Sequence, residues 1–312
     1  MVKRTISRII KISLFLLAVI VSDFSIGHLL EYMYVHSKSG KYYKLNYVVN
    51  KSKDEILIFG NSHAECHYIP SIIRDSLQFS CYNAGFRNQG VLYTYAIHQS
   101  ILRRYSPKLI IFNFDEGMLY SNEAAFKAEE AKLSELLPFC NNEIGIRKEI
   151  ERRSVFEKYK CFSSIYPFNS SVIYLLKYFL SDSDNFIDGY YPIYEKYDPP
   201  IINKTKTHLK STKKNHINEI ITGNLIALFN NYHTHNTQII AVISPIYDNS
   251  EKIDSSILAF FAKHGIPLLD YSIDPHFINN AAYFSDGHHL NDIGARLFSA
   301  IVAHDIKLIL KL

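Results

Sequence analysis

Short apolar runs alternate with longer amphipathic segments along most of the chain. Five of these runs are apolar without in/out alternation, which is typical of strands buried on both faces: residues 55–60, 79–83, 108–114, 238–244 and 266–270. Helical patterns occupy residues 69–77, 91–105, 215–231, 253–264 and 291–310. Strands that alternate with helices favour a parallel sheet covered on both faces. The pattern therefore predicts an α/β fold with a parallel sheet of about five strands.

The N-terminal segment is apolar on all sides, unlike these amphipathic helices. Its uninterrupted run covers residues 14–21, and four basic residues precede it: Lys3, Arg4, Arg8 and Lys11. Residues 9–33 are long enough to span a bilayer, which needs about 20 mostly apolar residues. The basic end is expected in the cytoplasm and the rest of the chain outside it. Because no small-residue cleavage site is clear, we expect an uncleaved single-pass signal anchor in the cytoplasmic (inner) membrane rather than a cleaved signal peptide.

These patterns predict three successive segments of the chain: an anchor, a tether and a folded domain. Residues 1–33 form a cytoplasmic tail and transmembrane anchor, and residues 34–53, rich in Lys and Tyr, form a tether. Residues 54–312 form the folded domain. Within it, residues 119–214 break the strand–helix rhythm and are predicted to be a mainly helical insertion. It would lie at the carboxyl ends of the strands, where ligands bind in open α/β sheets, as a lid or a substrate platform.

Composition narrows the classes of function. The 312 residues are 47% hydrophobic and 21% charged, which suits one sizeable core rather than a disordered chain. A net charge of +4 does not suggest a nucleic-acid partner. The four cysteines form no C-x-x-C pair, so structural zinc is not expected, and disulfides remain open. Neither a metal nor a cofactor is expected.

The first segment that carries chemistry follows the first predicted strand. The sequence Gly60-Asn61-Ser62 puts a hydroxyl at the start of a helix, where backbone N–H groups and positive potential favour a developing oxyanion. Ser62 is therefore the candidate nucleophile. The alternative is that Ser62 is only the N-cap of that helix.

The second segment precedes the last helix. A nucleophilic serine needs a base, and the base needs a carboxylate that fixes its tautomer. Asp286 and His289 lie three residues apart, a spacing that lets both side chains turn toward one point. His288 is the second-ranked candidate base. A third segment, Asn83-Ala84-Gly85, ends the second strand, and the Gly85 N–H could approach a substrate closely.

Together, Gly60-Asn61-Ser62, Asn83-Ala84-Gly85 and Asp286-Gly-His-His289-Leu-Asn resemble the first, second and last motif blocks of the SGNH/GDSL hydrolase superfamily, in the same order. The resemblance implies a three-layer α/β/α, flavodoxin-like fold. It implies Ser62 as nucleophile, His289 as base and Asp286 as its partner. It also implies that the N–H groups of Ser62 and Gly85 belong to the oxyanion hole.

The chain departs from the family pattern at two places. Asn61 stands where an Asp commonly precedes the nucleophile, and no Gly-x-Asn-Asp block follows the third strand. Asn113 lies inside that strand, so the third oxyanion donor is either Asn113 or absent. Envelope-anchored relatives that take part in O-acetylation or D-alanylation of glycans also diverge in this block, and the chain is more similar to those than to secreted lipases.

The resulting hypothesis is a serine-dependent esterase or acyltransferase that acts on acyl groups, O-acetyl above all, of cell-envelope glycans. Its partners would be an acylated glycan or a small ester, the membrane, and, for transfer, a membrane-bound protein that supplies the acyl group. Hydrolysis and transfer stay open. The alternative is a non-catalytic, membrane-tethered protein of the same fold that binds glycan or a partner in surface polysaccharide modification.

Overall fold

The computed structural model describes residues 2–119, 123–169, 171–181, 185–199, 218–248 and 252–312. It divides into two compact units. The helical unit comprises Met1–Asn46 and Leu133–Asp184, and the sheet unit comprises Tyr47–Lys132 and Asn185–Leu312. The end of the predicted insertion and the first residues of the predicted helix at 215–231 lie outside the described residues.

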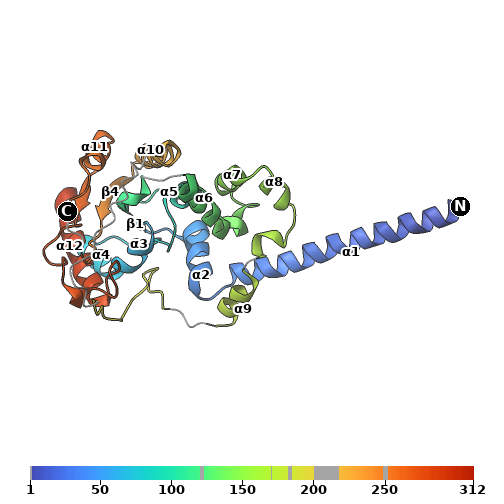
Figure 1. The fold of residues 1–312 in the computed structure, drawn as a ribbon, viewed down its shortest axis with the longest axis horizontal. Coiled ribbons are helices and arrows are strands. Elements are labelled where there is room, and N and C mark those ends of the chain that lie inside the picture. Colours follow the sequence, from blue (N-terminus) through green and yellow to red (C-terminus); the bar gives the residue numbers. More distant parts are fainter. Residues whose placement is uncertain (1, 120–122, 170, 182–184, 200–217, 249–251) are drawn as a thin grey trace. The chain divides into compact units, whose positions relative to one another are not determined.

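The sheet unit is built on a five-stranded parallel sheet (Figure 1). Its strands, in the spatial order β2-β1-β3-β4-β5, are β1 (Ile56–Phe59), β2 (Cys81–Asn83), β3 (Leu109–Asn113), β4 (Gln238–Ile243) and β5 (Leu268–Asp270). All five predicted strands are confirmed. The strand order reverses between β1 and β3, and in open α/β sheets ligands bind outside the carboxyl ends of the strands at such a point.

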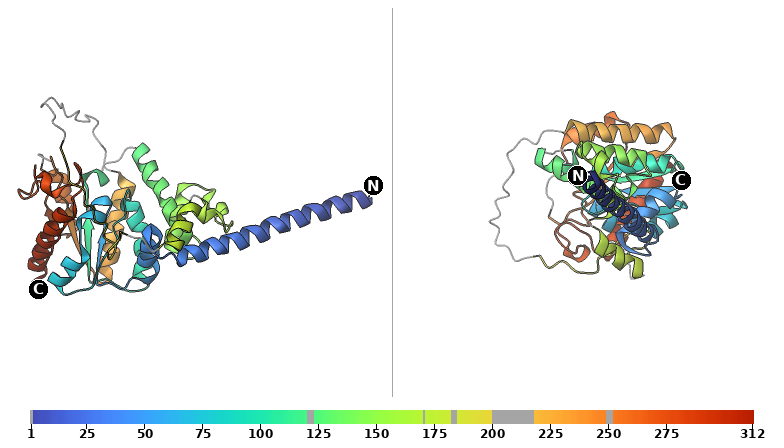
Figure 2. Two further views of the ribbon diagram at one scale, coloured as in Figure 1. Left: turned by 90° about the horizontal axis from the view of Figure 1, so that it is seen from below. Right: turned by 90° about the vertical axis from the view of Figure 1, so that its right-hand side faces the viewer.

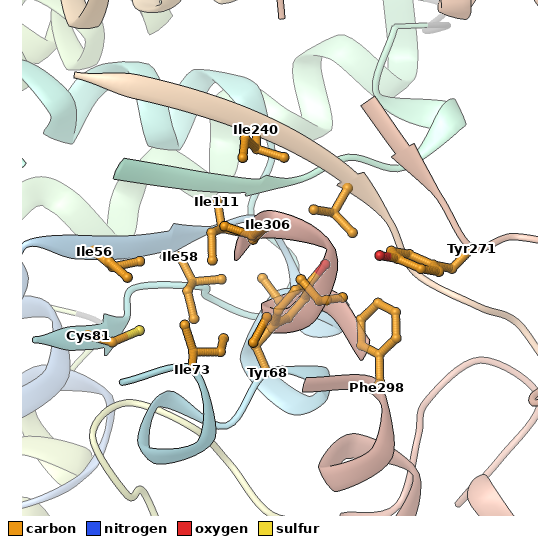
Figure 3. Close-up of a cluster of buried hydrophobic side chains, with 14 of the residues drawn as sticks. Ile56, Ile58, Tyr68, Ile73, Cys81, Ile111, Ile240, Tyr271, Phe298 and Ile306 are labelled. Carbon is orange, nitrogen blue, oxygen red and sulfur yellow. The ribbon is translucent and has the colours of Figure 1, made fainter. Parts of the chain in front are cut away.

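Helices cover both faces of this sheet (Figure 2). On one face, α4 (Pro70–Leu77) and α12 (Asp292–Leu310) pack on Ile58, Ile111 and Ile240 of the strands (Figure 3). On the other face, the ring of Phe112 lies 6.3 Å from that of Phe229 in α10. The helices of this second face are α5 (Val91–Leu102), α10 (Glu219–Thr234) and α11 (Ser255–Lys263). The predicted three-layer α/β/α fold is therefore confirmed.

The helical unit contains one helix that is long and apolar enough to cross a membrane. This is α1 (Val2–Val35), whose most apolar window has a mean hydropathy of 2.2 and is not buried at all. Only its C-terminal part is packed, through Gly27, Leu30, Met33 and Tyr34. The other helices of the unit are α2 (Gly40–Asn46), η3 (Leu133–Phe139), α7 (Ile144–Arg153), α8 (Glu157–Lys160), η4 (Tyr166–Phe168) and α9 (Val172–Leu180).

The segment predicted as a tether, residues 34–53, is folded, and that prediction is wrong. It contains the end of α1, helix α2 and a π-helical turn, η1 (Tyr47–Lys51). Tyr42, Leu45, Val48 and Val49 are buried. These apolar residues recur every three or four positions, which is a helical period. The many Lys and Tyr residues concealed this period in the sequence.

The predicted insertion is helical, but its boundaries differ from residues 119 and 214. A short turn, η2 (Glu116–Met118), leads into α6 (Glu123–Lys132), which belongs to the sheet unit. The chain enters the helical unit at Leu133 and returns to the sheet unit at Asn185. There the N–H of Tyr191 donates to the carbonyl of Glu65 at 2.9 Å. Residues 185–199 therefore pass over α3 (Ser62–His67), the helix that carries the candidate nucleophile.

Candidate active site

The turn between β1 and α3 places Ser62 at the carboxyl edge of the sheet. Gly60, in this turn, has a φ of +142°, and a Cβ there would lie 2.8 Å from the carbonyl oxygen of Asn113. A side chain at Gly60 is therefore excluded both by backbone conformation and by space. Asn61 caps α3, because its Oδ1 accepts the N–H of His63 at 2.9 Å. The capping role considered for Ser62 thus belongs to Asn61.

The loop before α12 holds Asp286 and His289 together. Asp286 Oδ1 accepts the backbone N–H groups of His288 and His289, both at 2.7 Å, so the chain turns around the carboxylate. His289 Nδ1 lies 2.9 Å from Asp286 Oδ2. Asn291, the N-cap of α12, secures the loop by donating to the carbonyls of Ala282 and Phe284; a short turn, η5 (Ala281–Tyr283), precedes it.

This loop brings His289 to Ser62. His289 Nε2 lies 2.9 Å from Ser62 Oγ, although the two residues are 227 positions apart in the sequence. With Nδ1–H donating to Asp286, Nε2 carries the lone pair that accepts the Ser62 hydroxyl hydrogen, a tautomer assigned from these hydrogen bonds. His288, the competing candidate base, has an exposed side chain. The carboxylate, imidazole and hydroxyl thus lie in the order of a Ser-His-Asp relay.

The electrostatic surroundings suit His289 as a proton acceptor. Burial lowers the pKa of His289 below its usual range, the Asp286 carboxylate partly offsets this, and the nearby His63 adds to the lowering. The neutral ring, which accepts protons, is then the main form near pH 7. Although burial raises the pKa of Asp286, hydrogen bonds from His288 and His289 outweigh it and lower that pKa overall. Asp286 therefore stays ionised.

A second acid–histidine pair, which the sequence reasoning missed, adjoins this relay. Asp115, two residues after β3, accepts hydrogen bonds from His63 Nδ1 at 2.9 Å and from Asn61 Nδ2. The His63 ring lies 5.5 Å from the His289 ring. Burial disfavours the charged form of His63, but the Asp115 carboxylate outweighs burial and raises the pKa of His63. The sequence signal was an acidic residue just beyond the third strand, where the family pattern would have placed an Asn-Asp pair.

His63 and His67, four residues apart, share a face of α3, and each has a partner in the protein. Their rings stack with centroids 4.9 Å apart. His67 Nε2 accepts the N–H of Leu290 at 3.0 Å, which joins α3 to the loop that carries His289. Burial holds the pKa of His67 well below its usual range, so this ring is neutral. Among the described residues, no three His, Cys, Asp or Glu side chains gather as a metal site would require.

Two predicted oxyanion donors have other roles in this geometry. The Gly85 N–H donates to Asn83 Oδ1 at 3.0 Å. A Cβ at Gly85 would lie 2.5 Å from the Cβ of Ala64, so the glycine allows β2 and α3 to pack closely. Asn113 is fully buried, and its Oδ1 accepts from the hydroxyls of Tyr68 and Ser244. The donor atom of Asn113, Nδ2, lies 3.5 Å from Asp115 Oδ1, and the third predicted donor, the Ser62 N–H, lies in the first turn of α3.

A pocket of about 320 Å³ opens beside Ser62. Its walls come from the β1–α3 turn, the segment before α5, the segment after β3, and α6: Asn61, Ser62, Asn88, Gln89, Gly90, Asp115, Gly117, Met118, Ala125, Glu129 and Lys132. Glu129 reaches from α6 to the N-terminus of α5, where its Oε1 accepts the N–H of Leu92 at 2.9 Å. Amide and carboxylate groups therefore surround the candidate nucleophile, and α6 forms one wall of its pocket.

Comparisons with known proteins leave the family open. No family model matches the chain, and no curated protein matches it. Among solved structures, the chain is similar to a protein from Desulfitobacterium hafniense that is assigned to the G-D-S-L family of lipolytic proteins. The identity is 10%, the TM-score is 0.39, and the match covers 80% of this chain and 97% of the other. A likeness this distant adds nothing to the strand order and site geometry described above.

Proposed function

We propose that this chain is a membrane-anchored serine esterase or acyltransferase of the SGNH/GDSL type, acting on O-acyl groups of cell-envelope glycans. The observation that carries the proposal is the contact of His289 Nε2 with Ser62 Oγ at 2.9 Å, with Asp286 on the opposite ring nitrogen. A surface loop without a role at Ser62 would not be expected to hold an imidazole nitrogen within hydrogen-bonding distance of this hydroxyl. The motif order of the SGNH/GDSL superfamily adds support.

In the proposed reaction, Ser62 Oγ attacks the carbonyl carbon of an acyl ester while His289 Nε2 takes its proton. The tetrahedral intermediate then collapses, and His289 returns the proton to the departing alcohol oxygen. The acyl group is left on Ser62. Water or a sugar hydroxyl, deprotonated by His289, attacks this ester and regenerates the Ser62 hydroxyl. Water gives an esterase and a sugar hydroxyl gives a transferase.

The walls of the pocket support a polar substrate. Asn88, Gln89, Asp115 and Glu129 all face the space beside Ser62. Such groups match the hydroxyls of a sugar, whereas a long acyl chain would need an apolar channel. A small acyl group on a glycan is therefore a better fit than a lipid ester.

The anchor is proposed to stay attached to the folded domain. Leu30, Met33 and Tyr34 at the end of α1 are buried in the helical unit. The helix continues without a break from the apolar run into these buried residues, and no small-residue cleavage site is clear after the run. By the positive-inside rule, the basic residues before the run favour a cytoplasmic N-terminus, and we propose that the site lies on the extracytoplasmic side.

The alternative, a non-catalytic protein of the same fold, is favoured by one observation. Asn113 is fully buried, its Oδ1 accepts from Tyr68 and Ser244, and its Nδ2 lies 3.5 Å from Asp115 Oδ1, so donation to an oxyanion at Ser62 would replace the contact with Asp115. Loss of one oxyanion donor lowers turnover by about 100- to 1,000-fold. Such a loss would still leave a reactive serine.

Covalent labelling by a fluorophosphonate separates the two functions. The full chain in detergent or nanodiscs should be labelled at Ser62, and Ser62→Ala should abolish labelling because no other group would attack the phosphorus. Ser71→Ala, in α4, is the matched control and should be labelled like the wild type. If folded wild-type protein is not labelled, or if Ser62→Ala is labelled equally, the catalytic proposal is wrong.

The pH dependence of acetyl-ester turnover should report on His289. Turnover should rise with pH as His289 loses its proton, with a midpoint below that of free imidazole, because burial lowers this pKa. His63→Gln should move the midpoint to higher pH, since the charge of His63 adds to the lowering. Profiles of kcat/KM for both proteins provide the measurement. A midpoint that does not move would mean that His63 carries no charge near His289.

A further inference from the structure

An acidic residue in α1 has an unusual set of partners. Asp23 follows the most apolar part of the helix, and its carboxylate accepts hydrogen bonds from three successive residues of the helical unit. Ser163 Oγ lies 2.5 Å from Oδ1, and the Ser164 N–H lies 2.7 Å from Oδ2. The Ile165 N–H is 3.4 Å from Oδ1. A charge near hydrocarbon is costly unless it is hydrogen-bonded, and these donors meet that need.

These hydrogen bonds hold residues 163–165 beside Asp23 and so determine their position along the axis of α1. A span of about 20 residues counted from Arg8 or Lys11, the last basic residues, ends beyond Asp23, near His28 or Glu31. Gly27 supports the same docking, because a Cβ there would lie 2.2 Å from the Cβ of Ser164. If α1 spans the membrane, residues 163–165 therefore lie about 8–12 Å inside the outer end of this span, at the boundary of headgroups and acyl chains.

The residues just before this contact point are apolar and unusually exposed. Val155, Phe156, Tyr159 and Phe162, here called the α8 patch, are exposed by 77%, 64%, 63% and 73%. Large apolar side chains that gather on a surface usually meet a partner or a membrane. Four basic residues lie just before or among them, Arg152, Arg153, Lys158 and Lys160, of which Arg152 pairs with Glu149 and Lys160 with Glu157. Aromatic and basic residues together are typical of segments that lie in the membrane interface.

We propose that the α8 patch inserts into the outer interface of the same bilayer that α1 crosses, so that the helical unit rests on the membrane through two contacts. We name lipid as the partner because the α8 patch adjoins the surface of α1 that would face the bilayer. Phe162 directly precedes Ser163, which binds Asp23 of α1, and the apolar window of α1 is not covered by protein. In Figure 1, α8 lies on the side of the helical unit toward which α1 extends. This inference rests on the membrane-spanning role of α1 and not on the catalytic proposal.

The chain contains no Trp, which permits a direct test. Phe162→Trp would be the sole tryptophan in the full chain, reconstituted in vesicles of phosphatidylcholine and phosphatidylglycerol. Lipids brominated near the headgroup end of the acyl chain should quench about half of its emission, since interfacial side chains lie some 5–10 Å deep. Iodide in the buffer should quench it little. Phe15→Trp, within the apolar run of α1, is the matched control and should be quenched by brominated lipids and shielded from iodide.

The two variants separate the possible results. Quenching of both supports the proposal. Quenching of Phe15→Trp alone, with Phe162→Trp open to iodide, would overturn it while leaving α1 in the membrane. If neither is quenched, α1 does not insert and the proposal also fails, whatever the labelling of Ser62 shows. A Phe162→Trp signal that is shielded from iodide and from bromine alike would point to a second protein copy on the patch, and would likewise overturn it.

Discussion

If the proposed relay operates, replacing His289 with alanine is expected to lower kcat for acetyl-ester turnover by about a million-fold, as loss of the base does in subtilisin. The reason is that His289 Nε2, 2.9 Å from Ser62 Oγ, is the group placed to accept the hydroxyl proton. Without it, Ser62 must attack as a neutral alcohol. Steady-state kinetics with an acetyl ester, together with the rate of fluorophosphonate labelling, measure the effect.

His288 provides a control one residue away. Its side chain is exposed, and in this loop only its backbone N–H is bound to Asp286, a bond that alanine keeps. His288→Ala should therefore leave kcat within about twofold of the wild type, as substitutions outside functional contacts do. Equal losses in both variants would contradict the assignment of His289 as the base. A larger loss in His288→Ala would transfer the role to His288.

Asp286→Asn should lower kcat by about ten-thousand-fold while changing KM little, by the logic of a Ser-His-Asp relay. Asp286 Oδ1 accepts two backbone N–H groups, and Oδ2 faces His289 Nδ1. In the variant, the amide oxygen keeps the backbone bonds and its NH₂ group faces Nδ1. That arrangement favours the His289 tautomer with the proton on Nε2, which cannot accept the proton of Ser62.

The chain offers a second Asp–His pair as the control for this change. Asp274 accepts from His276 Nδ1 at 2.8 Å, on the surface upstream of the site. Asp274→Asn should keep nearly full activity. Should Asp286→Asn retain more than about a tenth of the wild-type kcat, far above the residual rate of a broken relay, Asp286 would not control the tautomer of His289.

The strands and the Asp286–His289 pair could be predicted from the sequence because each depends on a short local signal. The run of residues 108–114 is apolar at nearly every position, and only a strand buried on both faces needs that pattern. Likewise, the three-residue spacing of Asp286 and His289 lets one turn hold both side chains. The pairing of Ser62 with His289 was implied by the resemblance of their segments to the first and last SGNH/GDSL motif blocks.

The features that were missed depend on contacts between distant segments. Asp115 and His63 are 52 positions apart, and nothing near either residue in the sequence shows that they pair. The Gly85 N–H donates to the side chain of Asn83, two residues earlier, and the sequence does not reveal this bond. Residues 34–53 carry polar side chains that suit a tether, yet Tyr42 and Leu45 are buried in the helical unit and Val49 in the sheet unit.

The separation of 227 residues between Ser62 and His289 also determines when the site can form. Ser62 emerges early in synthesis, whereas His289 and helix α12 belong to the last part of this sequence. Because α12 packs on α3 and α4, the helix that bears Ser62 gains much of its support only when α12 docks. A partly synthesised or partly translocated chain therefore has an inert serine. The proposed acyl-transfer chemistry would begin only after the whole sheet unit has been translocated and α12 has packed on α3 and α4.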